Sequence, residues 1–202
     1  MKKFLSLLLS CALLWAVLPV SDAFTDANGT ALATHNASWT IVTGAFEINT
    51  NGVQHTFAGR GLARWTGETF FNNQWVEGPA GTVGSDGLIG LALRIPTNGD
   101  VSGYYVHWST GGTFLAKLIT GTSTPLADTT APVEGAVMRL ETEGTTIRVL
   151  KNAVEILSVT DTSLTSGVAG IAAWYGPNTR LSHWEAGDIT AGGGRRRVVL
   201  VQ

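Results

Sequence analysis

The sequence predicts an all-β protein built as a two-sheet antiparallel β-sandwich. From Phe24 onward, short runs of alternating apolar and polar residues recur at regular intervals. Gly, Asn, Asp, Thr and Pro separate these runs, and helical periodicity is nearly absent, which is the rhythm of an all-β sandwich or barrel. The expected strands are too many for one flat sheet, so two packed sheets are favoured.

The expected strands fall in one domain, residues 24–190, with no internal repeat. In chain order they are 38–43, 45–50, 54–58, 61–65, 70–77, 88–95, 103–109, 114–120, 136–143, 145–151, 154–160, 168–175 and 179–189. Asn51-Gly52 and Gly111-Gly112 stand between strands, and such pairs supply the positive φ angles that tight hairpins need. Residues 143–157 read as a three-strand meander.

The central hairpin, residues 87–96 and 103–109, carries the sharpest functional signal. A one-residue slip of register would exchange the two faces of a strand. Only one register buries six apolar or aromatic side chains together: Leu91, Leu93, Ile95, Tyr104, Val106 and Trp108. The opposite face then carries Arg94, Tyr105 and His107 beside Ala92. A cation, a phenol and an imidazole on one strand surface predict a polar binding face.

Six tryptophans follow the N-terminal segment, and the alternation divides them. Trp39, Trp108 and Trp184 are expected in the core, whereas Trp75 and Trp174 are candidates for exposure. Exposed indole rings stack on the C–H faces of sugars, while buried ones are core bulk, which is the alternative for both candidates. The predicted ligand-binding set is therefore Arg94, Tyr105, His107, Trp75 and Trp174. The alternative for Arg94 is a salt-bridged sheet residue without a ligand.

The first 23 residues have the pattern of a secretory signal peptide. A basic Lys2-Lys3 head precedes the uncharged apolar run 4–20, and Ser21-Asp-Ala23 supplies small residues for cleavage after Ala23. We expect a secreted, extracellular protein, and the alternative is an uncleaved membrane anchor. Cys11 is the only cysteine, so the mature chain would have neither a disulfide nor a thiolate metal site.

The C-terminal residues 191–202 differ from the domain before them. Ala191-Gly-Gly-Gly194 forms a flexible joint, followed by Arg195-Arg-Arg197 and an apolar end. The segment predicts either a disordered end or a peptide that docks on a partner protein. Without Lys2, Lys3 and Asp22 the chain has 11 basic and 14 acidic residues, a net charge of −3. This mild acidity argues against nucleic-acid binding, and membrane contact is expected only through an uncleaved leader.

An ordered set of segments spanning residues 22–189 resembles a known family. The segments are Phe24-Thr-Asp-Ala-Asn-Gly-Thr30, residues 39–48, Gly90-Leu-Ala-Leu-Arg94 with Gly103-Tyr-Tyr105, residues 139–154, residues 166–171 and residues 181–189. Together they resemble the concanavalin A-like lectin/glucanase domains of the laminin-G-like kind. The resemblance implies a jelly-roll sandwich whose concave face meets glycans. It also implies a place among secreted bacterial proteins and phage virion or tail proteins.

Motifs for catalysis are missing. Glucanases of this fold carry Glu-x-Asp-x-x-Glu on one strand, where alternate residues share a face and reach one glycosidic bond. Neither this pattern nor Gly-x-Ser-x-Gly nor His-x-x-x-His occurs in the sequence. We therefore expect a non-catalytic protein that requires no cofactor.

A metal site is expected only at the start of the domain. Asp26 and Asn28 stand on alternate residues before Gly29, and their oxygens suit a structural calcium ion. Similar domains hold such an ion near the joined termini. An Asx turn that closes a loop needs the same residues and is the alternative.

The sequence thus predicts a secreted, non-catalytic carbohydrate-binding module whose partner is a glycan or a glycosylated surface. One alternative is a phage-type or cell-surface structural protein, a decoration domain whose C-terminal tail docks on a partner. A second alternative is a glycan-cleaving enzyme with an unrecognised site.

Overall fold

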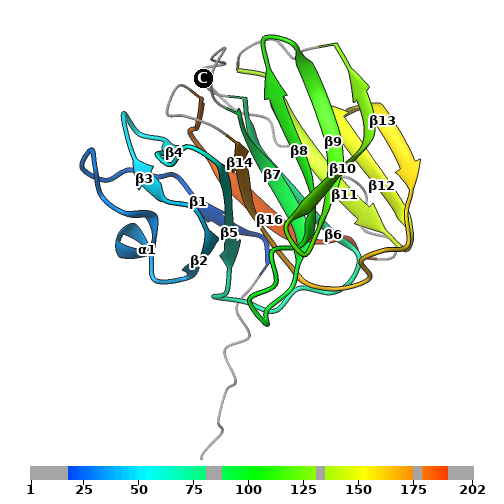
Figure 1. Cartoon of the computed structure of the whole chain (residues 1–202), viewed down its shortest axis with the longest axis horizontal. Coiled ribbons are helices and arrows are strands. Elements are labelled where there is room, and N and C mark those ends of the chain that lie inside the picture. The colour runs from blue at the N-terminus through cyan, green and yellow to red at the C-terminus, as the bar shows by residue number, and fades with distance from the viewer. Residues whose placement is uncertain (1–17, 81–87, 131–134, 175–178, 191–202) are drawn as a thin grey trace, which may run out of the picture.

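A computed structural model gives the fold, and it describes residues 18–80, 88–130, 135–174 and 179–190. Two large antiparallel sheets pack face to face, and a small sheet with one short helix lies beside them (Figure 1). The predicted two-sheet sandwich is confirmed. The predicted tail, residues 191–202, and most of the predicted leader lie outside the described residues.

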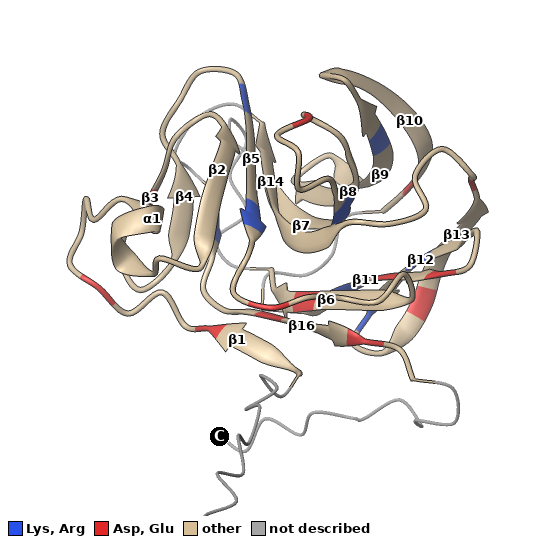
Figure 2. Cartoon of the chain, turned by 90° about the horizontal axis from the view of Figure 1, so that it is seen from below, with Lys and Arg blue, Asp and Glu red and all other residues tan. Residues whose placement is uncertain are grey.

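One layer is a seven-stranded sheet in which neighbouring strands are hydrogen-bonded. Its strands, from edge to edge, are β10 (Thr122–Thr129), β9 (Gly112–Ile119), β8 (Gly103–Ser109), β7 (Leu88–Ile95), β14 (Val168–Trp174), β5 (Arg60–Trp65) and β2 (Trp39–Thr43). Figure 2 shows that this sheet curves, with both edges rising away from the other layer. Its outer face is therefore concave.

The second layer is a six-stranded sheet. In spatial order its strands are β1 (Val20–Asp22), β16 (Trp184–Asp188), β6 (Gln74–Pro79), β11 (Val137–Glu143), β12 (Thr146–Lys151) and β13 (Val154–Thr160). A three-stranded sheet completes the fold with β15 (Arg180–Leu181), β4 (Val53–His55) and β3 (Phe46–Ile48), and helix α1 (Leu32–His35) lies against β2 and β3. No helix among the described residues is long and apolar enough to cross a membrane.

The central hairpin adopts the predicted register. Leu91 pairs with Val106, Leu93 with Tyr104 and Ile89 with Trp108, and all six side chains are fully buried between the sheets. The expected core tryptophans are buried as well. Trp39 and Trp184 meet with ring centroids 4.8 Å apart, and Trp65 packs against both. Because Trp184 belongs to the six-stranded sheet, this cluster joins the two layers.

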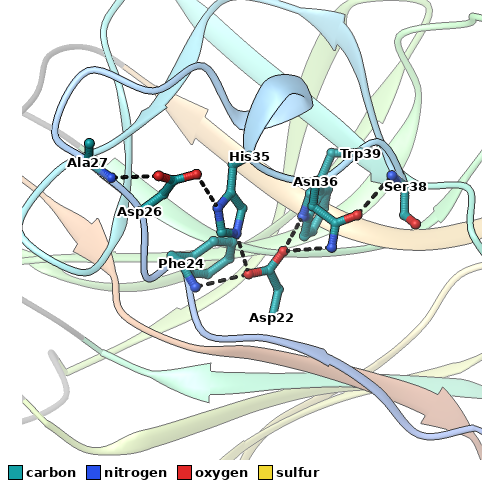
Figure 3. Close-up of polar contacts among 8 residues, drawn as sticks. All are labelled: Asp22, Phe24, Asp26, Ala27, His35, Asn36, Ser38 and Trp39. Atoms are coloured by element: carbon teal, nitrogen blue, oxygen red, sulfur yellow. Dashed lines mark hydrogen bonds and ion pairs between the residues drawn. The ribbon is translucent and has the colours of Figure 1, made fainter.

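Strand β1 lies within the predicted leader, and its last residue, Asp22, is the centre of a hydrogen-bond network (Figure 3). Asp22 is 6% exposed and accepts the backbone N–H of Phe24 at 2.9 Å. Its carboxylate also contacts the ring of His35 at 2.8 Å and accepts from Trp39 at 2.9 Å and Asn36 at 3.4 Å. Four donors thus fix β1 to helix α1 and β2, so residues just before Ala23 are part of the fold.

Several elements besides β1 differ from the sequence prediction. The strand expected over 179–189 is divided into β15 and β16, which belong to different sheets. Strand β10, which contains Pro125, was not among the expected strands; it is an edge strand, where proline costs no ladder hydrogen bond. The strand expected over 70–77 begins only at Gln74, after a loop. Helix α1 spans one turn, too short to leave a periodic pattern in the sequence.

Candidate binding face

The concave face of the seven-stranded sheet is the candidate site. Its members follow from the register, because residues paired with one another across neighbouring strands point to the same side of a sheet. The side away from the core carries Arg60, Leu62 and Arg64 of β5, Ala172 and Trp174 of β14, Ala92 of β7, Tyr105 and His107 of β8, and Phe114 and Ala116 of β9. These residues are called the concave face below.

A row of three aromatic rings crosses this face. His107 stacks between Tyr105, at 5.6 Å between ring centroids, and Phe114, at 5.3 Å. Tyr105 is 5% exposed and its hydroxyl lies 2.6 Å from the Ser123 hydroxyl of β10. Burial lowers the pKa of the His107 imidazole to about 4, so the ring is neutral at physiological pH. The row therefore presents the partly exposed rings of His107, as an uncharged imidazole, and Phe114, with the buried Tyr105 ring as their support.

A cation and an indole stand at the β5–β14 side of the same face. Arg60 and Trp174 are paired across these strands, and the Arg60 guanidinium lies 4.1 Å from the centroid of the Trp174 ring. Arg60 also donates to the carbonyl of Gly121, which follows β9. The guanidinium thus reaches across the curved sheet, and it brings positive charge to the face that holds the aromatic row.

Several polar atoms of the concave face are buried without a hydrogen-bond partner. Among the described residues, Nε of Arg60, Nε of Arg64 and Nδ1 of His107 belong to this group. Buried polar atoms are nearly always hydrogen-bonded, so such exceptions call for an explanation, often a water molecule or a ligand. Four more buried atoms of this kind in the described chain lie away from the concave face, in His55, Trp108 and Thr113, so these nitrogens do not by themselves mark a binding site.

The prediction that Arg94 shares this face is wrong. Between two pairs, Val168–Ile95 and Gly170–Ala92, β7 has one residue more than β14, which is a β-bulge, and Arg94 adopts φ 54° there. Arg94 is 1% exposed, and its guanidinium donates to the carbonyls of Asn72, Gly144 and Leu164. The bulge turns the side chain toward the core side, where it holds three loops together.

The structure also separates the two candidate tryptophans. Trp75 is in β6, on the outer face of the six-stranded sheet, across the sandwich from Trp174. The guanidinium of Arg139 lies 4.0 Å from its ring centroid and pairs with Glu77 at 3.0 Å and Glu141 at 2.8 Å. Tyr105, His107 and Trp174 are thus brought together, whereas Trp75 and Arg94 lie elsewhere.

The concave face has no acidic residue along its central strands. The described strands β5, β7, β8, β9 and β14 contain neither Asp nor Glu. Glycoside hydrolysis in most enzymes requires a pair of carboxyl groups on either side of the scissile bond. The chemistry available on these strands is stacking and hydrogen bonding.

The predicted calcium ligands hold their own loop together. Oδ1 of Asp26 accepts the backbone N–H of Ala27 at 2.8 Å, and Oδ2 lies 3.4 Å from the ring of His35 (Figure 3). Oδ1 of Asn28 accepts the N–H of Thr50 at 2.8 Å. The described residues contain no group of three or more His, Cys, Asp or Glu side chains suited to a metal ion. Calcium binding stays a prediction from the sequence.

Sequence reasoning missed Arg60, Arg64 and Phe114. Arg60 and Arg64 alternate with Leu62 in Arg60-Gly-Leu-Ala-Arg64, so a shared face could have been read from the spacing. Their placement beside Trp174 depends on the pairing of β5 with β14, which lie far apart in the sequence. Phe114 gave no signal of its own.

Comparison with solved structures finds several proteins of similar architecture. It is similar to the carbohydrate binding module CBM66 from Bacillus subtilis, with a TM-score of 0.59 and 16% identity over 76% of this chain and 94% of that chain. It is also similar to the Crh5 transglycosylase in complex with NAG, with a TM-score of 0.59 and 10% identity over 87% and 86% of the two chains. A third similar structure is a β-1,3-1,4-glucanase (lichenase) derived from a mouse hindgut metagenome. Its TM-score is 0.59 and its sequence identity 7%, over 86% of this chain and 100% of that chain.

These likenesses show the fold, which is the concanavalin A-like lectin/glucanase jelly roll, as the sequence resemblance predicted. Structures with this fold include both a binding module and enzymes, so the fold does not decide between them. No family model matches the sequence, and the search of curated proteins found no match.

Proposed function

We propose that this protein is a secreted carbohydrate-binding module whose concave face, around Tyr105, His107, Phe114, Trp174 and Arg60, contacts a glycan. The observation that carries the proposal is the gathering on one face of an aromatic row and an indole–guanidinium pair. Aromatic rings suit the C–H faces of sugars, and the Arg60 guanidinium is a hydrogen-bond donor for their hydroxyls.

Two further observations support the proposal. The central strands of the concave face lack the carboxylates that hydrolysis needs. Proteins of this fold include the carbohydrate binding module CBM66, and also a transglycosylase solved with NAG bound, which supports a glycan ligand but not the absence of catalysis. The neutral state of His107 suits a hydrogen bond with an uncharged sugar, because no ionised partner is required. Secretion rests on the basic head and the apolar run of the predicted leader. Because β1 belongs to the fold, cleavage after Ala23 is not part of the proposal.

The test is a glycan-array screen of the domain, followed by titration of the best ligand against two matched variants. Trp174→Ala removes an indole on the concave face, and Trp75→Ala removes one on the opposite sheet. Each indole carries an arginine at nearly the same distance, 4.1 Å and 4.0 Å. We expect Trp174→Ala to weaken binding about tenfold and Trp75→Ala to change it less than twofold.

A second variant, His107→Ala, should weaken the same ligand, because it removes the middle ring of the row. Absence of any glycan ligand, or loss of binding only in Trp75→Ala, contradicts the proposed site. Release of reducing sugar from a bound polysaccharide contradicts the non-catalytic assignment.

A further inference from the structure

A groove of about 670 Å³ opens at one end of the sandwich, outside the concave face. Three connections line it: residues 66–70 between β5 and β6, residues 96–98 after β7, and residues 163–168 between β13 and β14. Its volume lies in the range of about 300–1,000 Å³ that small-molecule sites occupy. The groove is therefore large enough for a ligand of its own.

The lining combines unused hydroxyl groups with an apolar floor. Thr69, Thr97, Thr165 and Ser166 are exposed in the groove, and their side chains make no hydrogen bond within the described chain. Phe70 belongs to the same lining and is 7% exposed. A surface that presents both hydroxyl groups and apolar carbon matches a ligand that carries hydroxyl groups on an apolar carbon framework.

Charge narrows the class of ligand. Among the lining residues Glu68 is the one charged side chain, and the Trp65 indole N–H donates to its carboxylate. No Lys or Arg belongs to the lining. The cations that bond lining residues are already engaged, Lys117 with Asp161 at 2.6 Å and Arg64 and Arg94 with backbone carbonyls. Among the described residues, the groove therefore has no unengaged cation for a phosphate, a sulfate or an acidic sugar, and its carboxylate would repel such a ligand. An uncharged, polyhydroxylated ligand meets no such penalty.

We propose that this groove is a second carbohydrate-binding site, selective for neutral sugars. The choice of sugars as the ligand class rests on the proposed function, whereas the site itself rests on the groove. One contact ties the two regions together, because Arg64 of the concave face donates to the carbonyl of Pro96 in the groove wall at 2.7 Å. The two sites nevertheless use different side chains and can be altered separately.

The indole N–H groups of Trp65 and Trp174 provide one NMR reporter for each site, since Trp65 bonds a groove residue and Trp174 lies on the concave face. The probes are cellotriose, mannotriose and a fructose trisaccharide, each titrated into the ¹⁵N-labelled domain. We expect a saturable shift of the Trp65 resonance with at least one probe. The double variant Thr69→Val/Ser166→Ala should weaken that response at least about fivefold, while Trp174→Ala leaves it unchanged.

The outcomes separate the two proposals. A Trp174 response without any Trp65 response overturns the groove site and leaves the concave face standing. If neither indole resonance shifts with any probe, both proposed sites are overturned. A Trp65 response that survives the double variant, or that disappears in Trp174→Ala, also overturns the groove site. Because the two altered hydroxyls bond nothing in the described chain, the double variant should melt at the wild-type temperature, which excludes misfolding as a cause.

Discussion

Arg94 offers the sharpest test of the packing argument, because the structure turns a predicted ligand contact into a support of the fold. The perturbation is Arg94→Ala. The wild-type guanidinium donates to the carbonyls of Leu164 and Gly144 at 2.7 Å each and of Asn72 at 3.0 Å. These acceptors belong to three different connections between strands. One side chain therefore joins three connections, beside the direct bond from the Gly144 N–H to Asn73 at 2.8 Å.

The expected loss of folding stability follows from the number and kind of hydrogen bonds that Arg94 makes. Hydrogen bonds to charged groups contribute about 1.5–3 kcal/mol each, but loosened carbonyls regain water, so the net loss is about 3 kcal/mol. In a domain of this size that corresponds to a melting temperature lower by about 6–12 °C. Arg94→Lys should lose about 2 kcal/mol, because an ammonium group reaches fewer of the three acceptors.

The assay is urea unfolding, with Arg148→Ala as the matched control. Arg148 is also in a strand, but it lies on an outer surface and pairs with Glu143 at 2.9 Å and Glu155 at 3.5 Å. Surface ion pairs of this kind contribute about 0–1 kcal/mol, so the control should unfold close to wild type. At a temperature where Arg94→Ala is folded, it should bind glycan within twofold of wild type. Wild-type stability combined with lost binding would refute the reasoning.

Three further predictions concern pH, the N-terminus and calcium. The pKa of His107 is about 4 in the fold and 6.5 in the unfolded chain, so the unfolded state takes up a proton first as the pH falls. Stability should decline by up to about 3 kcal/mol between pH 6.5 and pH 4, and His107→Gln should flatten that part of a urea-unfolding series. A chain beginning at Phe24 lacks β1 and the carboxylate of Asp22. Its melting temperature should be at least about 5 °C below that of a chain beginning at Leu18. Equal melting temperatures would contradict the role of β1. If Asp26 and Asn28 bind calcium, millimolar CaCl₂ should raise the melting temperature relative to EDTA, and Asp26→Ala should abolish the difference.

Much of the fold could be predicted because alternation was strong where strands are central. Leu91, Val106 and Trp108 have the period of a half-buried strand, and burying them together leaves one register. The buried positions of Trp39 and Trp184 follow from the same rule. The alternation of apolar and polar residues was sufficient to predict which side chains are buried wherever the strand is regular.

The site could be predicted only in part, because its assembly depends on events that alternation does not record. One extra residue in β7 reversed Arg94, and no feature of the local sequence marks that bulge. Trp75 and Trp174 both point away from the core, yet strand order places them on different sheets and so on opposite faces of the sandwich. Arg60 joins Trp174 through the pairing of two strands more than a hundred residues apart.

Residues at the end of the predicted leader form a strand in the structure. Residues 20–22 read as the end of an apolar run before a cleavage site, but in the structure they pair with β16. The carboxylate of Asp22 then finds donors on α1 and β2 that only the fold brings near (Figure 3). A single charged residue at the edge of a leader carried no hint of this network.

The central claim is that the concave face is where a glycan contacts this protein. The most direct measurement is a set of intermolecular NOEs between the best glycan-array ligand and the labelled domain. We predict contacts from sugar ring protons to the rings of His107, Phe114 and Trp174. Contacts confined to Trp75 and the other residues of the six-stranded sheet would contradict the claim.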